Sequence, residues 1–225
     1  MVRNSQSSLL IQAMDKNEYW LLDSVVEARD SLKCLVSEDI EAAFNKRSHG
    51  LNRDELISVL DRLFRSGDLL AERKEKSVSK GFFIPTQMEI EEAFDGRLMC
   101  FYGLTSQGGA RWEEVSQPHW ERYISDSVYA DPQEGEIIGS DRDLIEQYDS
   151  LSQHDSDISV VPGSKQWDVL RPWQATYWKE LPVGHRLRFK YEWVERSPEP
   201  TDPKIWEWFK EIHNWSKHFG LHTLH

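Results

Sequence analysis

One stretch of the chain, residues 37–85, limits the possible fold more than any other. Apolar side chains recur there at helical spacing in two successive segments, and a capping residue precedes each of them. Two strand-like segments follow, with a polar loop between them. The expected order is a helix from Ser37 to about Gly50, a helix over residues 53–65, a strand over 68–72, a loop over 73–80 and a strand over 81–85.

The segments on either side extend this pattern. We expect a long helix over residues 16–35, because Tyr19, Leu22 and Val26 recur at helical spacing. Residues 86–94 are helix-like. After them, residues 101–109 carry the sequence Phe-Tyr-Gly-Leu-Thr-Ser-Gln-Gly-Gly, in which Thr105 is placed to cap a further helix that continues through Val115.

This order of elements resembles the winged helix-turn-helix superfamily. The segment 101–109 is also similar to a tyrosine-x-leucine-threonine-x-x-glycine box in several families of bacterial winged-helix regulators, although there the box usually closes the wing without an inserted helix. The resemblance covers about the first half of the chain. It implies a winged domain over residues 16–118, and DNA is the usual partner of such domains.

The resemblance would place the helix over residues 53–65 in a major groove and the loop over 73–80 along a phosphate backbone. The acidic side chains of the same helix argue against DNA binding, because Asp54, Glu55 and Asp61 would repel phosphates. The alternative is a solvated helix in a winged domain that contacts proteins. The candidate nucleic-acid-binding residues are Arg53, Arg62, Arg65, Arg73, Lys74, Lys76 and Lys80.

Charge is unevenly distributed along the chain. The 225 residues carry a net charge of −12, which disfavours binding of the whole protein to phosphate through its overall charge. Residues 46–80 carry nine basic and six acidic side chains, whereas residues 81–163 carry four and seventeen. The candidate winged segment is therefore locally basic, and the middle of the chain holds most of the acidity.

The second half is rich in tryptophan and predicts an antiparallel sheet with a C-terminal helix. We expect strands over residues 173–179 and 185–193, joined by a turn at 180–184. In the second strand, Leu187, Phe189, Tyr191 and Trp193 alternate with polar residues. The basic residues of that other face are candidates for anion or partner binding, and a solvated outer face is the alternative: Arg186, Arg188 and Lys190.

No sequence motif for an enzyme, metal or cofactor is found. Asp141 and Asp143 are better explained as first-turn acids of a helix that begins near Ser140 than as catalytic carboxylates. Cys34 and Cys100 are far apart, which suits a reducing compartment. The histidines near the C-terminus lack the spacing of a dedicated zinc site: His213, His218, His222 and His225.

We therefore expect an α+β protein with three parts: a flexible N-terminus (1–15), a winged-helix-like domain (16–118) and a smaller Trp-rich domain (119–225). The expected function is non-enzymatic binding of a protein partner. Because this chain is acidic, a partner with a basic surface would suit it. The acidic, Trp-rich composition is similar to that of bacterial immunity proteins, which neutralise basic nuclease toxins. The alternative is a DNA-binding regulator whose second domain senses a ligand or dimerises. A cytoplasmic location is expected, with no membrane segment and no cofactor.

Overall fold

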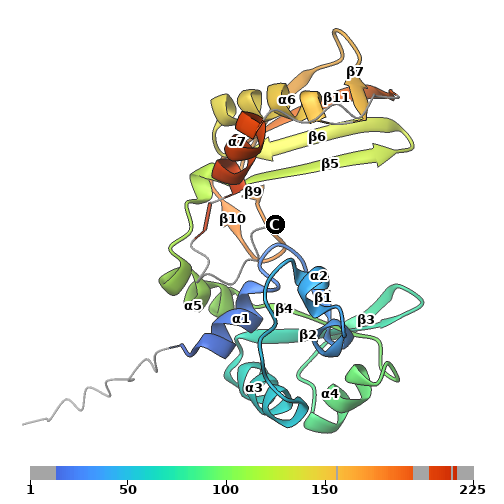
Figure 1. Ribbon diagram of the computed structural model, residues 1–225, viewed down its shortest axis with the longest axis vertical. Helices are drawn as coiled ribbons and strands as arrows, with labels where there is room; N and C mark the ends of the chain where they lie inside the picture. The colour runs from blue at the N-terminus through green and yellow to red at the C-terminus, as the bar shows by residue number, and fades with distance from the viewer. Residues whose placement is uncertain (1–13, 156, 195–202, 214, 217–225) are drawn as a thin grey trace, which may run out of the picture.

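The computed structural model describes residues 14–155, 157–194, 203–213, 215 and 216, and it shows a mixed α+β protein. Two bodies lie one above the other, joined by a narrower region that contains α5 and the short strands β9 and β10 (Figure 1). The first body holds the elements up to α5, and the second holds a curved sheet covered by two helices. Both are built around antiparallel sheets.

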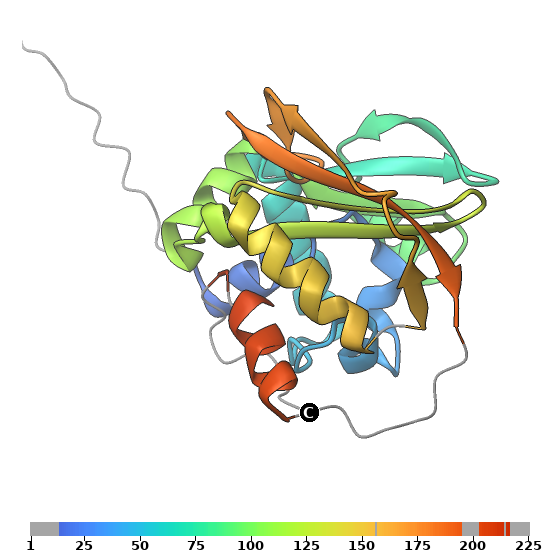
Figure 2. The same cartoon turned by 90° about the horizontal axis from the view of Figure 1, so that it is seen from above.

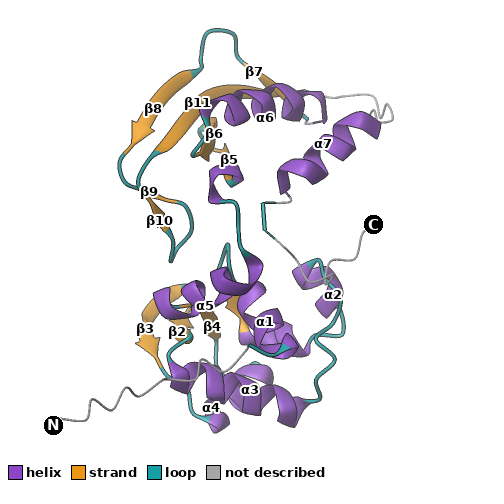
Figure 3. Ribbon diagram, turned by 90° about the vertical axis from the view of Figure 1, so that its left-hand side faces the viewer, coloured by secondary structure: helices purple, strands orange, loops and turns teal. Residues whose placement is uncertain are grey.

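The first body contains a four-stranded antiparallel sheet in the order β1-β4-β2-β3, with helices packed against it. Figure 3 shows α3 and α4 on the side of the strands away from the second body, and α1 beside the strands. The elements are α1 (Lys16–Asp23), β1 (Asp30–Ser31), the 3-10 helix η1 (Leu32–Val36), α2 (Ile40–Phe44), α3 (Arg53–Ser66), β2 (Leu69–Glu75), β3 (Val78–Phe83), α4 (Gln87–Phe94), β4 (Cys100–Leu104) and α5 (Ser106–Ser116).

Helix α3 confirms the prediction of a helix over residues 53–65. The Asn52 side chain accepts a hydrogen bond from the Glu55 amide while the Glu55 carboxylate accepts one from the Asn52 amide, which is a capping box. Gly67 ends the helix with a φ of +82°, a left-handed conformation that glycine adopts easily. The buried face of α3, which includes Leu60 and Leu63, anchors it in the core.

The predicted helix over residues 16–35 is wrong in its length. Helix α1 ends at Asp23, and Asp30 and Ser31 pair with β4 instead of continuing the helix. Distant side chains hold the intervening chain in place. The Tyr177 hydroxyl donates to the Val25 carbonyl at 2.6 Å, and the Trp178 indole donates to the Val26 carbonyl at 2.8 Å. The next helix, α2, is also shorter than predicted: it begins at Ile40 and ends at Phe44, where Asn45 follows with a φ of +47°.

The polar loop predicted over residues 73–80 is largely strand. β2 continues to Glu75 and β3 begins at Val78, so that only Lys76 and Ser77 form the turn. Both turn residues have positive φ values, +48° and +67°, as a tight two-residue hairpin requires. Because neither residue is Gly or Asn, the sequence carries no ordinary signal for such a turn.

The predicted cap of α5 is confirmed, and the helix-like segment over residues 86–94 forms α4. Thr86 forms a capping box with Glu89, and the Thr105 hydroxyl accepts from the Gly108 amide at 3.1 Å. The glycines of α5 allow a close approach to other segments. A Cβ atom on Gly108 would lie 2.0 Å from the Asp68 carbonyl oxygen, and one on Gly109 would lie 2.1 Å from the Trp178 ring. The glycine pair therefore serves packing in this fold.

The second body is an antiparallel sheet in the order β5-β6-β11-β7, with β8 also paired to β11. Helix α6 crosses this sheet and α7 lies beside it (Figure 2). The elements are the 3-10 helix η2 (Trp120–Arg122), β5 (Ile124–Ala130), β6 (Gln133–Gly139), α6 (Arg142–Asp155), β7 (Ile158–Val160), β8 (Gln166–Leu170), β9 (Trp173–Gln174), β10 (Glu180–Leu181), β11 (Gly184–Trp193) and α7 (Pro203–His213).

The predicted pairing of strands 173–179 and 185–193 is wrong. Within the first of these ranges only Trp173 and Gln174 form a strand, and they pair with β10. β11 pairs instead with β6, β7 and β8. The alternation along β11 holds for Leu187, Phe189 and Tyr191, which are buried, but Trp193 is 58% exposed. From the sequence we expect the C-terminal helix to begin at the cap Asp202 and to end at Gly220, and both residues lie outside the described residues.

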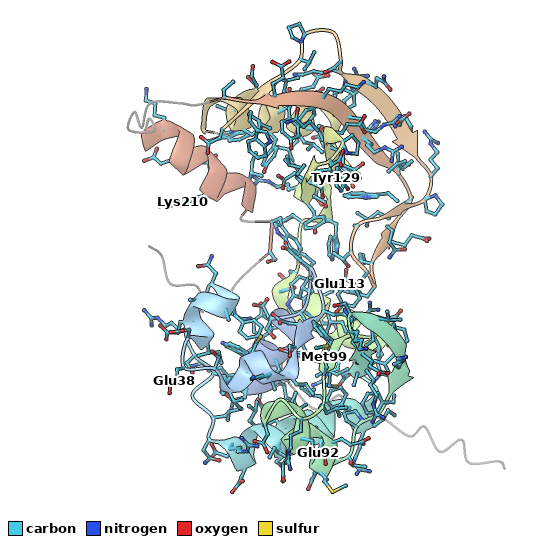
Figure 4. All side chains as sticks on the ribbon, turned by 90° about the vertical axis from the view of Figure 1, so that its right-hand side faces the viewer. Glu38, Glu92, Met99, Glu113, Tyr129 and Lys210 are labelled. Carbon is cyan, nitrogen blue, oxygen red and sulfur yellow. The ribbon has the colours of Figure 1, made fainter. Side chains whose placement is uncertain are left out.

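Aromatic side chains fill the region between the two bodies. The Trp112 ring contacts three others at centroid distances of 5.9 to 6.3 Å, and its indole N–H donates to the Asp23 carboxylate at 3.0 Å. Lys179 and Glu113 form an ion pair beside them, and Figure 4 shows Glu113 between the bodies. We call this cluster the aromatic junction: Trp112, Trp120, Tyr123, Trp173, Trp178 and Trp215.

Among the helices that the structure describes, none combines the length and the apolar composition needed to cross a membrane.

Candidate interaction surfaces

The three arginines proposed for the DNA-facing side of α3 are bound by carboxylates of the same chain. Arg53 contacts Asp95 at 2.6 Å, and this contact lowers the pKa of the Asp95 carboxyl. Arg62 contacts both Glu18 and Asp15, at 2.9 and 3.2 Å. In addition, Arg65 makes two hydrogen bonds to Asp61 one helical turn earlier. Contact with phosphate would have to displace these partners.

Three of the four cations of the β2–β3 hairpin are also bound. Arg73 contacts Glu89 at 2.9 Å, and Lys80 contacts Glu75 at 3.2 Å. The Lys74 ammonium lies 4.0 Å from both the Glu72 carboxylate and the centroid of the Phe101 ring. Lys76 occupies the turn, where no carboxylate of the described chain lies within 4.0 Å of its ammonium. Six of the seven candidate DNA contacts are thus neutralised internally.

One face of the hairpin and its neighbour β4 carries aromatic and charged side chains together. Glu72 of β2 is paired in register with Phe82 on one side and Phe101 on the other. The Arg29 guanidinium lies 4.9 Å from the Phe82 ring centroid. We call this surface the hairpin patch: Arg29, Lys74, Phe82 and Phe101, with Glu72 buried among them at 7% exposure. Aromatic and arginine side chains at one place are typical of protein interfaces.

Strand β3 forms the open edge of the first sheet. It pairs with β2 on one side only, and its residues from Val78 to Phe82 are all exposed. An edge strand presents unpaired backbone groups to which another chain can add. Of the ten exposed large apolar side chains among the described residues, three lie on this edge or directly after it: Val78, Phe82 and Ile84.

The basic stripe on β11 is largely paired with acids of neighbouring strands. Arg186 and Arg188 both contact Asp168 of β8, at 3.1 and 2.9 Å, and Arg186 also lies 3.8 Å from Glu136 of β6. The pKa of the Asp168 carboxyl is lowered, first by its hydrogen bond to Arg186. Lys190 is exposed, and its backbone amide donates to Ser164. The stripe is thus mainly an internal cross-strand network.

The carboxylates and the thiol that could have been catalytic have contacts that stabilise the fold. Asp143 lies in the first turn of α6, as expected, whereas Asp141 accepts from the amides of Asp143 and Leu144 and so caps the helix in place of Ser140. Burial raises the pKa of the Cys100 thiol to about 12, so that it stays protonated. In the described part of the chain, no group of three His, Cys, Asp or Glu side chains is placed to hold a metal. His218, His222 and His225 lie outside it, as does the side chain of His213.

One buried network was not predicted. Asp68 is fully buried and binds the Arg111 guanidinium, which also contacts Glu18 at 2.8 Å. Glu18 in turn binds Arg62. The network ties α1, α3 and α5 together. Only the position of Asp68 directly after the α3 cap Gly67 was visible in the sequence, since its partner lies 43 residues away.

Comparisons of the chain with models of protein families, with curated proteins and with solved structures gave no match.

Proposed function

We propose that this chain is a non-enzymatic binding protein that recognises another protein through the hairpin patch and the open edge of β3. In this proposal the first body is a winged helix-turn-helix domain whose wing is the β2–β3 hairpin. The second body, joined to it through the aromatic junction, is the Trp-rich domain. The net charge of −12 would suit a partner with a basic surface, as the partners of immunity-type acidic inhibitors have.

The observation that carries the proposal is that the cations of this region already have partners within the chain, whereas several of its apolar side chains are exposed. Six of the seven cations that would contact DNA are bound to carboxylates of the same chain. By contrast, Phe82 and Ile84 are more than half exposed beside an unpaired strand edge. Covering exposed apolar side chains with a partner lowers the free energy of the complex. Cations that are already paired with carboxylates are stabilised less by contact with a new anion.

A photocrosslinking experiment tests the proposal. A photoreactive amino acid replaces Phe82 in one variant and Val169 in a control variant, because Val169 is similarly exposed, at 55%, on the second body. Irradiation in cells of the source organism should give a discrete adduct from position 82 and none from position 169. The adduct should be destroyed by protease and resist nuclease. Equal labelling from both positions would contradict a specific surface.

The alternative is a winged-helix regulator that binds DNA, and it predicts a different result. Titration with duplex DNA at several salt concentrations would then give an affinity that falls steeply with salt, because phosphate contacts release counterions. An adduct at position 82 that nuclease destroys would point the same way. We expect weak binding with little salt dependence. Substitution of Arg65 by Glu is also expected to leave protein capture unchanged, since Arg65 faces Asp61 and lies outside the hairpin patch.

A further inference from the structure

Arg29 is the cation of the hairpin patch that has no carboxylate beside it. It lies in the loop between α1 and β1, and its side chain is partly exposed. Within the described chain, no carboxylate oxygen lies within 4.0 Å of its guanidinium, and the guanidinium forms no hydrogen bond. The other cation of the patch, Lys74, lies 4.0 Å from the Glu72 carboxylate. Arg29 thus differs from the paired cations of α3 and the hairpin.

The N–H donors of Arg29 are accessible from solvent. In the described part of the chain, the Ser116 hydroxyl is the one buried side-chain polar atom that lacks a hydrogen-bond partner. The nitrogens of Arg29 also lack partners within the chain, and since none of them belongs to that buried class, each is at least partly accessible. A guanidinium carries five N–H donors in one plane, and two of them can bind the two oxygens of one carboxylate.

Two aromatic rings hold the Arg29 side chain in place. Its guanidinium carbon lies 4.5 Å from the centroid of the Tyr177 ring and 4.9 Å from that of the Phe82 ring. Tyr177 is itself fixed, since its hydroxyl donates to the Val25 carbonyl at 2.6 Å and accepts from the Leu104 amide at 2.5 Å. Contacts between a guanidinium and aromatic rings orient the cation without giving its N–H donors an oxygen acceptor. The donors are therefore positioned and still unused.

The strand under Arg29 leaves room for this arrangement. A Cβ atom on Gly103 of β4 would lie 2.7 Å from the Cγ atom of Arg29 and 2.8 Å from the Tyr177 hydroxyl oxygen. Any side chain at position 103 would therefore push both residues away from the strand. Because glycine stands there, the stem of Arg29 packs directly on β4 and the ring of Tyr177 stays beside it. The position of the guanidinium is thus built into the fold before any ligand binds.

We propose that Arg29 binds a carboxylate of the protein partner, while the exposed ring of Phe82 contacts the apolar atoms next to that carboxylate. This inference rests on the proposed function, because it names the chemical group that the same surface takes. The charge balance favours a carboxylate over a phosphate. One unpaired cation matches a single negative charge, and the buried Glu72 carboxylate, paired in register with Phe82, would repel a second one. The net charge of −12 acts over longer distances, whereas this contact needs only one acid within the partner's surface.

The probe is 3-phenylpropanoate, a carboxylate on a short apolar chain, added to the whole protein at constant ionic strength. The readout is the Nε–H signal of Arg29 in ¹H–¹⁵N NMR spectra, identified by its loss in Arg29→Lys. We expect a saturable shift with a dissociation constant on the order of ten millimolar, as befits a ligand of few atoms. 3-Phenylpropanamide, which has the same shape without the charge, should bind about ten-fold more weakly. Equal binding of the amide, or no shift with the propanoate, would overturn the proposal.

Two variants separate the guanidinium from its charge. Arg29→Lys keeps the positive charge but loses the planar pair of donors, and it should weaken propanoate binding by roughly ten-fold, measured from the backbone amide signal of Phe82. Arg97→Lys is the matched control, because Arg97 is exposed and is paired with Asp95 at 2.8 Å. It should bind the propanoate as the unmodified protein does. Unchanged binding in Arg29→Lys, with an unchanged thermal midpoint, would also overturn the proposal.

Two peptides distinguish the sources of the carboxylate. Acetyl-Gly-Phe-Glu-Gly-amide presents it on a side chain, and acetyl-Gly-Gly-Phe with a free carboxyl group presents it at a chain end. A shift of the Arg29 signal by either peptide supports the proposal and identifies the source, and no shift with both would refute it. The adduct expected at position 82 is measured independently. An adduct without any shift would refute the carboxylate proposal alone, whereas shifts without an adduct would refute the proposed function and keep Arg29 as a carboxylate site.

Discussion

The aromatic junction and the hairpin patch use large apolar side chains in opposite ways. At the junction, Trp112 is 1% exposed, is surrounded by other rings and has its indole N–H bound to Asp23. On the hairpin patch, Phe82 is 51% exposed and is covered only in part by Arg29. Burial of an aromatic side chain stabilises the fold, whereas an exposed one is available to a partner. The comparison separates side chains that hold the molecule together from those that can recognise another.

Substitution of Trp112 by Ala should give the largest effect on stability. It removes a buried aromatic ring at the centre of the junction, which typically costs about 3–5 kcal/mol in the free energy of unfolding. Urea unfolding followed by circular dichroism would measure the loss. Trp193→Ala is the matched control, because this tryptophan is 58% exposed, and it should change stability by less than about 0.5 kcal/mol. Similar losses of unfolding free energy in both variants would mean that the aromatic junction does not stabilise the fold more than an exposed tryptophan does.

Substitution of Gly108 by Ala should give the next largest effect. The added Cβ atom would meet the backbone oxygen of Asp68 at 2.0 Å, and a backbone atom cannot move aside as a flexible side chain can. We expect a loss of about 1–3 kcal/mol, the usual range for overpacking. Ser106→Ala at the exposed first position of the same helix is the control. If Gly108→Ala were neutral, α5 would not be held against Asp68 as described.

Substitution of Phe82 by Ser should affect stability much less than Trp112→Ala does, and it should affect binding most. The lost contact with Arg29 is worth about 0.5–1 kcal/mol at an exposed site. Partner capture, followed with a crosslinker at the neighbouring exposed position Ile84, should nevertheless fall strongly. Val169→Ser on the second body should leave capture intact. A large loss of stability in Phe82→Ser would instead place this residue with the structural aromatic groups.

Local signals in the sequence were reliable where the structure is stabilised locally. The cap before the helix over residues 53–65, the end of that helix by Gly67 and the cap at Thr105 all formed as predicted, since each depends on residues within four positions. The alternation along β11 was visible for the same reason. The hairpin turn was missed because Lys76 and Ser77 take positive φ values without the usual glycine or asparagine.

Contacts between distant residues could not be predicted. The hydrogen bond from Tyr177 to Val25 joins positions 152 residues apart, and it helps to explain why α1 ends early. The seven candidate cations were located correctly on α3 and the hairpin, but their partners were unknown. Arg62, for example, binds Glu18 from 44 residues away. Basic residues in a sequence therefore predict a basic surface only when their internal partners are known.

The smallest expected effect is a shift in the pKa of Asp168. In the second body, as in the first, arginines are paired with a carboxylate of the same chain. Hydrogen bonds from Arg186, with the charge of Arg188 nearby, lower the pKa of this carboxyl in the folded protein. Such a group contributes stability above the unfolded pKa of ~3.9 and loses it as the pH falls through the lower folded value. NMR titration of the Asp168 carboxyl should therefore give a pKa below ~3.9, and Arg186→Met should raise it. Lys190→Met on the same strand is the control and should leave it nearly unchanged, because the Asp168 contacts come from Arg186 and Arg188. If the pKa of Asp168 were the same in Arg186→Met as in the unmodified protein, the arginines of the basic stripe would be open to solvent and available to an external anion.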